Sequence, residues 1–134
     1  MFTKVLIPLV WTAVSPAAVD VHDLLDAIRE VETGGHANPA RAVGDGGRSL
    51  GPYQISRAYW RDSGVPGRYE QVRNAAYAER VVLAYWRRHC PNALKRLDLK
   101  TLARTHNGGP AGPSKRRTLP YWRRVQEQMT QSSG

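Results

Sequence analysis

The sequence predicts one small α+β domain that is predominantly helical, with about five helices and a glycine-rich loop or short β-hairpin between the first two. Three observations support this prediction. Apolar residues recur at three- and four-residue intervals in several stretches, which is the spacing of one helix face. Residues 34–51 contain six glycines and one proline, a composition typical of a loop. At 134 residues, the chain is long enough for a single modest hydrophobic core.

The first helix is predicted to begin at Val21. Its apolar face consists of Val21, Leu24, Leu25, Ile28 and Val31. Asp20 suits the N-cap, and Asp23 in the first turn favours the positive end of the helix dipole. The glycine pair 34–35 ends the helix. Glu32 therefore lies in its last turn, facing whatever the following loop encloses.

The loop that follows is predicted to hold a short β-hairpin near Gly46 and Gly47. Pro52 suits the first turn of a second helix, which we expect to run to about Trp60. The glycine- and proline-containing segment 62–67 then breaks the chain again.

Three more helices complete the predicted domain. The longest is expected at about 69–89, and Pro91 stops it. Its apolar stripe consists of Val72, Ala75, Ala76, Val82, Tyr85 and Trp86. A short helix is expected from position 98 or 99 to 105, and the last helix at 118–129. Residues 131–134 are expected to fray.

The N-terminus has the pattern of an export signal. One lysine in residues 1–4 precedes a mostly apolar run at 5–14, and small residues at 15–18 offer a peptidase cleavage site. We therefore expect residues 1–18 to be a signal peptide, residues 19–130 to form the domain, and the product to be periplasmic or secreted. The apolar run is too short for a membrane span, so stable membrane insertion is not expected. The alternative is an uncleaved apolar strand or a loose anchor.

The chain is strongly basic. Its 20 lysines and arginines against 11 acidic residues give a net charge of +9. Such a surplus favours polyanionic partners, namely nucleic acid, an anionic membrane or a carboxylate-rich bacterial wall. The cations are spread over several predicted helices rather than clustered on one element, which argues against nucleic acid. Three arginine pairs are expected to be solvated and would also suit anionic wall polymers: Arg87-Arg88, Arg116-Arg117 and Arg123-Arg124.

No cofactor and no metal site are expected. Cys90 is the only thiol, so no intramolecular disulfide can form. No histidine or aspartate pair lies close enough to Cys90 to indicate a nucleophile or a zinc site, and we expect this thiol to be structural and partly buried. His36 and His89 have no ligand-like partners in the sequence.

Two carboxylates have the layout of acid-assisted cleavage of a sugar–sugar bond. That reaction needs one acid that stays protonated near the leaving oxygen and a second group that stays charged. Glu32, at the end of an apolar-faced helix, is placed to be partly buried, which favours the protonated form. Asp45 lies among Gly44, Gly46 and Gly47, whose bare backbone leaves room for solvent and a bulky substrate. Taken singly, each carboxylate is more often structural, as a solvated helix end or a turn former.

Five segments carry a resemblance to a known family. They are Glu30-Val31-Glu32-Thr33-Gly34, Ser49-Leu50-Gly51-Pro52-Tyr53-Gln54-Ile55, Tyr59-Trp60-Arg61-Asp62-Ser63-Gly64, Ala103-Arg104-Thr105-His106-Asn107-Gly108-Gly109-Pro110 and Tyr121-Trp122. In order and spacing they resemble the invertebrate-type lysozymes, also called the destabilase family, over roughly residues 21–126. A broader similarity joins the lytic transglycosylases. Animal members carry many disulfides and this chain can form none, so it resembles a bacterial or phage-borne relative.

The resemblance implies a lysozyme-like fold that cleaves the β-1,4 bond between N-acetylmuramic acid and N-acetylglucosamine in peptidoglycan. Glu32 matches the family's proton donor. Asp45 matches its second carboxylate, with a one-residue gap before Gln54. The family's glycan-groove positions fall on Ser49, Tyr53, Gln54, His106 and Asn107. Their amide and hydroxyl groups suit the substituents of sugars, and position 106 is favoured as part of the groove wall over a proton shuttle.

Two other functions stay open at this point. A lytic transglycosylase would use the same Glu32 and form 1,6-anhydro ends, with the sugar's own C6 hydroxyl replacing water. A non-catalytic module would bind peptidoglycan in the same groove. Isopeptide cleavage, credited to some family members, is discounted because no lysine lies between Lys4 and Lys95. The expected partners are glycan strands and anionic wall polymers, with no nucleic acid, and a monomer is expected.

Overall fold

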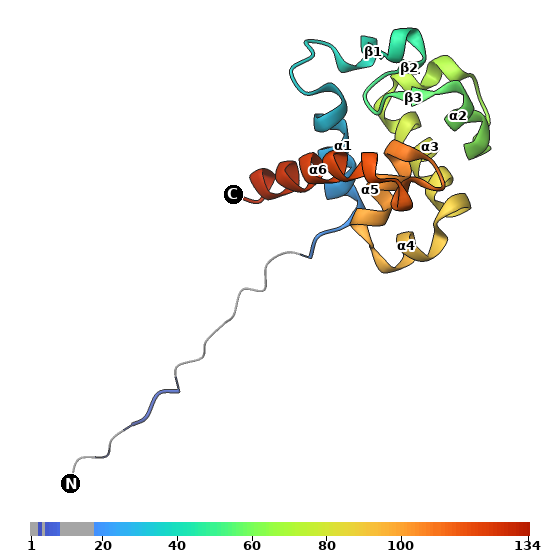
Figure 1. Ribbon diagram of the computed structural model, residues 1–134. Helices are drawn as coiled ribbons and strands as arrows, with labels where there is room; N and C mark the ends of the chain where they lie inside the picture. Colours follow the sequence, from blue (N-terminus) through green and yellow to red (C-terminus); the bar gives the residue numbers. More distant parts are fainter. Residues whose placement is uncertain (1–2, 4, 9–17) are drawn as a thin grey trace.

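Figure 1 shows the computed structural model, which describes residues 3, 5–8 and 18–134. Its α-helices are α1 (Val21–Thr33), α2 (Arg57–Ser63), α3 (Ala75–His89), α4 (Pro91–Arg96), α5 (Leu99–Gly108) and α6 (Leu119–Ser132). Its strands are β1 (Val43–Gly44), β2 (Ser49–Leu50) and β3 (Ile55–Ser56). Five short 3-10 helices are η1 (Pro39–Arg41), η2 (Asp45–Gly47), η3 (Tyr69–Arg73), η4 (Gly112–Ser114) and η5 (Arg116–Thr118). The predicted α+β, predominantly helical class is confirmed. Most of the predicted signal peptide, 1–18, lies outside the described residues.

The first helix forms as predicted. Asp20 Oδ1 accepts a hydrogen bond from the Asp23 amide at 3.0 Å, and Asp23 Oδ2 accepts one from the Asp20 amide at 2.9 Å. This reciprocal capping box fixes the start of α1. The helix ends before Gly34, as predicted, and packs mainly against α6, which lies beside it in Figure 1. The first and last helices of the domain therefore pack together, and α6 contacts the last turn of α1.

The strands form a three-stranded antiparallel sheet in the order β1-β2-β3. Gly44 of β1 pairs with Ser49 of β2, and η2 makes the turn between them. The hairpin predicted near Gly46 and Gly47 is confirmed. The third strand was not predicted.

The second helix begins later than predicted. Residues 51–54 form a turn, because Gly51 (φ +78°) and Gln54 (φ +50°) adopt the left-handed conformation. The chain then adds β3 to the sheet, and α2 begins after Ser56, whose hydroxyl oxygen caps the helix. The prediction that Pro52 begins this helix was wrong, because the turn and the strand pairing come first.

The predicted longest helix is two elements. η3 and α3 meet at Asn74, whose side chain accepts a hydrogen bond from the Tyr77 amide at 3.0 Å and caps α3. The C-terminal end at His89 was predicted correctly. Pro91 follows one residue after α3, but it also begins α4, which was not predicted, because a proline in a first helical turn leaves no amide unpaired.

The last two helices extend past their predicted ends. α5 continues to Gly108 and therefore includes positions 106 and 107, which were expected to lie after it. α6 continues to Ser132, so part of the tail that was expected to fray is helical.

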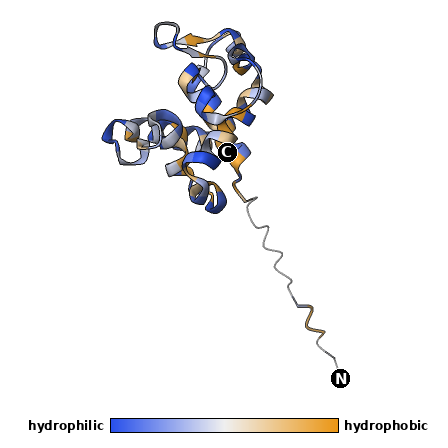
Figure 2. Cartoon of the chain, turned by 90° about the vertical axis from the view of Figure 1, so that its right-hand side faces the viewer, coloured by the Kyte–Doolittle hydropathy of each residue, from blue (hydrophilic) through white to orange (hydrophobic). Residues whose placement is uncertain are grey.

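One hydrophobic core lies among the helices. Trp86 is fully buried, and its Nε1 donates a hydrogen bond to the Leu102 carbonyl at 3.0 Å. Figure 2 shows that individual helices carry both hydrophobic and hydrophilic residues, as expected when one face is buried. Each fully buried Leu or Ile, such as Leu24 and Ile28, contributes about 1.5–3 kcal/mol relative to an exposed one. Cys90 is partly buried, as predicted. Among the described residues, no helix has both the length and the apolar character needed to cross a membrane.

Candidate active site

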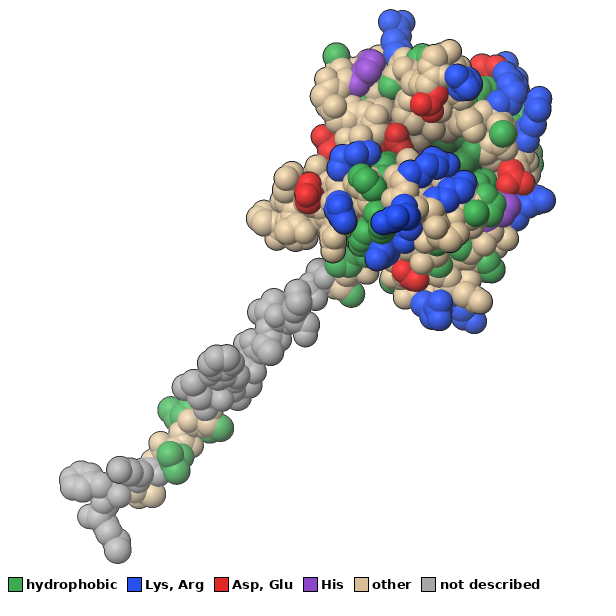
Figure 3. All heavy atoms as spheres, in the orientation of Figure 1, with side chains coloured by type: hydrophobic (Ala, Val, Ile, Leu, Met, Phe, Trp, Pro, Cys, Tyr) green, Lys and Arg blue, Asp and Glu red, His purple; other side chains and the backbone are tan. Residues whose placement is uncertain are grey.

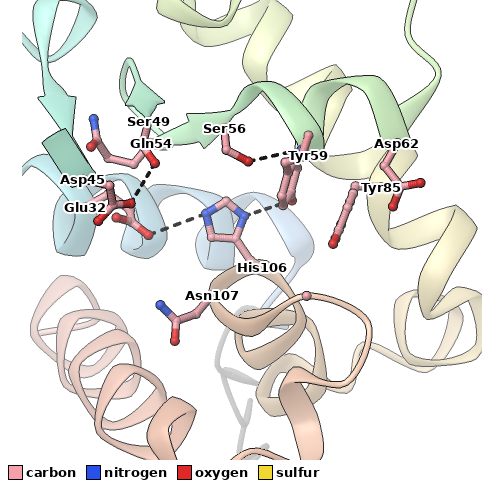
Figure 4. Close-up of a pocket in the computed structure, with 12 residues that line it drawn as sticks. Glu32, Asp45, Ser49, Gln54, Ser56, Tyr59, Asp62, Tyr85, His106 and Asn107 are labelled. Carbon is pink, nitrogen blue, oxygen red and sulfur yellow. Dashed lines mark hydrogen bonds and ion pairs between the residues drawn. The ribbon is translucent and has the colours of Figure 1, made fainter. Parts of the chain in front are cut away.

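A cavity of about 460 Å³ lies between the sheet, α2 and the C-terminal part of α5 (Figure 4). Its lining residues are Glu32, Asp45, Ser49, Gln54, Ser56, Ala58, Tyr59, Asp62, Tyr85, His106, Asn107 and Gly109. They come from α1, the sheet and its turns, α2, α3, α5 and the residue after α5. Every site residue predicted from the sequence is in this lining except Tyr53.

Glu32 lies in the last turn of α1 and is held by the last helix. Tyr121 Oη donates a hydrogen bond to Glu32 Oε1 at 3.0 Å. His106 Nε2 is 3.6 Å from the same oxygen, which is too long for a direct hydrogen bond. The Glu32 side chain is 19% exposed. Its carboxyl group is therefore partly withdrawn from water, fixed through one oxygen, and open to the cavity.

His106 is buried in the wall of the cavity between two partners. Its Nε2 lies 3.1 Å from the Tyr53 carbonyl oxygen, and its Nδ1 lies 2.9 Å from Tyr59 Oη. A carbonyl oxygen only accepts, so Nε2 carries the hydrogen and, in the neutral ring, Nδ1 accepts from the Tyr59 hydroxyl. Burial, followed by the effect of Tyr85, raises the pKa of Tyr59 well above its usual value, which keeps this hydroxyl a donor. Both ring nitrogens are thus engaged by the protein.

Asp45 lies in the turn between β1 and β2 and is exposed. Its Oδ2 accepts a hydrogen bond from Ser49 Oγ at 2.9 Å, and Ser49 is itself buried. The backbone of Asp45 has a φ of +53°, a left-handed conformation that Asp tolerates better than most residues. A β carbon added at Gly46 or Gly47 would meet no atom within 4 Å, so the backbone beside this carboxylate is open.

Gln54 reaches the cavity because Gly44 leaves room for it. Gln54 Nε2 donates a hydrogen bond to the Gly51 carbonyl at 2.9 Å. A β carbon on Gly44 would lie 2.1 Å from Gln54 Oε1, closer than real contacts allow. The glycine at position 44 is therefore needed for this placement of the amide.

Comparison with known proteins identifies the family. The Destabilase family model matches residues 22–128, most of the chain. The chain belongs to the destabilase family. The predicted membership is confirmed.

Individual proteins similar to this chain also support its membership of the destabilase family. The chain is 44% identical to Lysozyme 1 of Crassostrea virginica over 82 residues, which cover 60% of this chain and 45% of that protein, so it spans less than half of that relative. It is 33% identical to the invertebrate-type lysozyme of Ruditapes philippinarum over 100 residues, with 73% and 74% covered. The crystal structure of Tapes japonica lysozyme matches with a TM-score of 0.67 and 32% identity, covering 78% of this chain and 87% of that one.

Tyr53 does not lie where the family resemblance implied. It is fully buried, and its hydroxyl donates a hydrogen bond to Glu79 Oε1 at 2.8 Å, away from the cavity. The expectation that its ring offers a flat face to a sugar is contradicted by this burial. Gln54, the next residue, has a left-handed backbone conformation, and its side chain does line the cavity. Tyr53 contributes through its backbone carbonyl, which holds His106.

Sequence reasoning missed several lining residues of this destabilase-family cavity. Tyr59 and Asp62 lie in a segment that carried the resemblance, but the sequence attached no chemical role to them. Tyr85 falls in the apolar stripe of the predicted long helix, where a tyrosine is expected to be a core residue. Nothing in the sequence distinguishes it from a core tyrosine, because its access to the cavity depends on how α2 and α3 pack together.

Within residues 3, 5–8 and 18–134, no group of three or more His, Cys, Asp or Glu side chains is arranged to hold a metal ion.

Proposed function

We propose that this destabilase-family chain is an exported muramidase that hydrolyses the β-1,4 bond between N-acetylmuramic acid and N-acetylglucosamine in peptidoglycan. Glu32 is the general acid and Asp45 is its partner carboxylate. The observation that carries the proposal is the placement of Glu32. Its carboxyl group is partly buried, anchored by Tyr121, and faces a cavity shared with Asp45 and four polar groove residues.

Glu32 has one oxygen available for the substrate. Oε1 accepts from Tyr121, whereas no hydrogen bond of Oε2 is found among the described residues. In the proposed step, protonated Glu32 gives its proton to the glycosidic oxygen while the bond from that oxygen to C1 of the muramic acid breaks. Water then adds to C1, and the proton that the water releases returns to Glu32. The acid is thereby regenerated.

Asp45 stabilises the positive charge that develops at C1. Its hydrogen bond from Ser49 fixes one carboxylate oxygen, and the open backbone at Gly46 and Gly47 lets a glycan approach. An ionised carboxylate in this position stabilises an oxocarbenium-like centre or attacks it as a nucleophile. Ser49 therefore positions the carboxylate and has no separate chemical step.

Two of the remaining predicted residues bind the glycan. Gln54 and Asn107 offer amide groups to the cavity from opposite walls, the first from the turn before β3 and the second from α5. Amides match the acetamido and hydroxyl groups of both sugars of peptidoglycan. His106 supports this wall, because both of its ring nitrogens are already bonded to the protein.

An arginine-rich face supports attachment to the bacterial wall. Figure 3 shows Lys and Arg side chains gathered over the region of α6 and the segment before it. The Lys and Arg residues of α6 and of the segment before it are Lys115, Arg116, Arg117, Arg123 and Arg124. We propose that this face holds anionic wall polymers through long-range attraction that salt screens. Export through the leader at 1–18 would bring the enzyme to that wall.

Product analysis tests the proposal. Purified residues 19–134 are incubated with peptidoglycan, and the released muropeptides are weighed by mass spectrometry. Muropeptides with reducing ends are expected. Products with 1,6-anhydro ends would show that the enzyme is a transglycosylase and not a hydrolase. Binding to peptidoglycan without release of any muropeptide would show that the chain is a non-catalytic binding module.

A further inference from the structure

The cavity extends beyond the two proposed catalytic carboxylates. Figure 4 shows Glu32 and Asp45 at one end and Asp62 and Tyr85 at the opposite end, with Tyr59 between the two groups. The proposed cleavage uses nothing at the Asp62 end. The structure of that end nevertheless has the features of a binding site.

Tyr85 has a fixed ring and an unused hydroxyl. Its ring stacks on Tyr59, with centroids 3.7 Å apart and planes 11° apart, and His89 contacts it edge-on at 4.5 Å. Tyr85 is only 4% exposed, yet within the described residues its hydroxyl makes no hydrogen bond. Nor is that hydroxyl sealed off, because the sole fully enclosed, unpaired side-chain polar atom of the described chain is Thr105 Oγ1. Buried tyrosine hydroxyls usually have a partner, so this one is available to a ligand.

Asp62 is fixed beside it with acceptor capacity to spare. Its Oδ2 contacts His89 Nε2, and its Oδ1 lies 3.5 Å from Arg88 Nε. Arg88 Nη1 also donates to the Asp62 backbone carbonyl at 3.3 Å. An ionised carboxylate has about four acceptor positions, and these contacts occupy two of them. The Asp62 side chain is 38% exposed, so the others remain accessible from the cavity.

These two groups together suit a neutral, hydroxyl-bearing ligand. A cation would gain little from Asp62, because Arg88 already lies against its carboxylate. An anion would be repelled by that carboxylate. Burial, followed by the nearby Asp62, raises the pKa of Tyr85 to about 12, so the phenol stays a neutral donor. A carboxylate that accepts beside a phenol that donates matches the hydroxyl and N–H groups of a sugar.

We propose that Asp62 and Tyr85 form a further saccharide subsite, which binds a sugar of the same glycan strand away from the bond that is cleaved. Asp62 accepts from a hydroxyl or amide N–H of that sugar, and Tyr85 donates to one of its oxygens. The inference rests on the proposed muramidase function and deepens it. The subsite makes the enzyme prefer longer glycans, because only a longer strand reaches from Glu32 to Asp62.

Tyr85→Phe tests the subsite with little disturbance of the fold, since the hydroxyl has no protein partner to lose. The measured quantity is the ratio of kcat/KM for a long peptidoglycan glycan to that for the shortest glycan cleaved. Loss of one neutral hydrogen bond is expected to lower this ratio about three- to tenfold. The matched control is Tyr77→Phe in the same helix. Tyr77 Oη bonds to Trp60 and Pro66 outside the cavity, so this variant should lower Tm and keep the ratio.

An unchanged ratio in Tyr85→Phe would overturn the inference and leave the proposed function standing, provided that Glu32→Gln is inactive. Absence of glycan cleavage by the wild type would instead count against the proposed function itself. If Tyr85→Phe fails to fold, NMR shifts of the Asp62 and Tyr85 amides are followed in the Glu32→Gln protein. Shifts that appear with long but not short glycans support the subsite, and shifts absent with both overturn it.

Discussion

The Tyr121 hydroxyl donates a 3.0 Å hydrogen bond to Glu32 Oε1 and so connects α6 to the last turn of α1 across 89 residues of sequence. Tyr121 is almost fully buried, and burial, followed by the nearby Glu32, raises its pKa well above the usual value. The phenol therefore keeps its proton and points it at the carboxyl group. The orientation of the proposed acid depends on how the first and last helices pack.

Tyr121→Phe is expected to lower kcat/KM about 10- to 100-fold, because a hydrogen bond to an ionisable group is worth about 1.5–3 kcal/mol and about 1.4 kcal/mol corresponds to a factor of ten. Steady-state kinetics on peptidoglycan measure the loss. The control is Tyr69→Phe, which removes a hydrogen bond to the Ile55 carbonyl outside the cavity lining and should affect Tm rather than turnover. Equal turnover in Tyr121→Phe and wild type would show that the hydroxyl does not orient Glu32.

Asp45→Asn separates hydrolysis from transglycosylation. A hydrolase that relies on the charge of this carboxylate should lose about 100-fold or more in kcat. A transglycosylase, in which Glu32 works with the sugar's own hydroxyl, should lose little. Asp26→Asn is the control, since Asp26 is an exposed acid on α1 outside the cavity. A mild effect at Asp45, together with reducing-end products, would remove this residue from the proposed mechanism.

Gly44→Ala should disturb Gln54 rather than the backbone. Gly44 has φ −123°, which any residue adopts, but its new β carbon would meet Gln54 Oε1. We expect a several-fold rise in KM for glycan. In a Gln54→Ala background the same substitution should add almost no further loss, because the colliding amide is gone. A full additional loss in that background would show that position 44 acts by another route.

Tyrosine ionisation should destabilise the domain at alkaline pH. Burial is the main cause that raises the pKa values of Tyr53, Tyr59 and Tyr121, with the Glu79 hydrogen bond adding to the shift at Tyr53. An unfolded tyrosine titrates near pH 10. The folded state therefore binds more protons than the unfolded state above about pH 10. This contribution to stability is complete below that pH and is lost as pH rises further.

Absorbance at 295 nm and circular dichroism, followed together against pH, test this expectation. These phenols should ionise only as the helical signal is lost. Ionisation of all six tyrosines near pH 10 with the helical signal intact would contradict it.

The sequence predicted those features that depend on local patterns. Asp20 marks the start of α1 and the glycine pair at 34–35 follows its end, as predicted. Glu32 therefore lies in the last turn of this helix. The segments around Gln54 and His106, whose residue types and spacing resemble the family, supply residues that line one cavity.

Other features depend on packing that no local pattern reveals. The break at Asn74 arises from a side-chain cap within an apolar stripe that continues on both sides. At the left-handed turn at Gln54, Tyr53 is buried and Gln54 lines the cavity, so only one of these two predicted groove residues lies there. Tyr85 reaches the cavity only because α3 packs against α2.

The most direct test compares Glu32→Gln with the wild type in both turnover and binding. Only the transition state needs the proton, so the variant should bind peptidoglycan glycan with nearly unchanged Kd while kcat falls by about 100- to 10,000-fold. Turnover close to that of the wild type would contradict the account, because the cavity would then cleave its substrate without the acid at position 32.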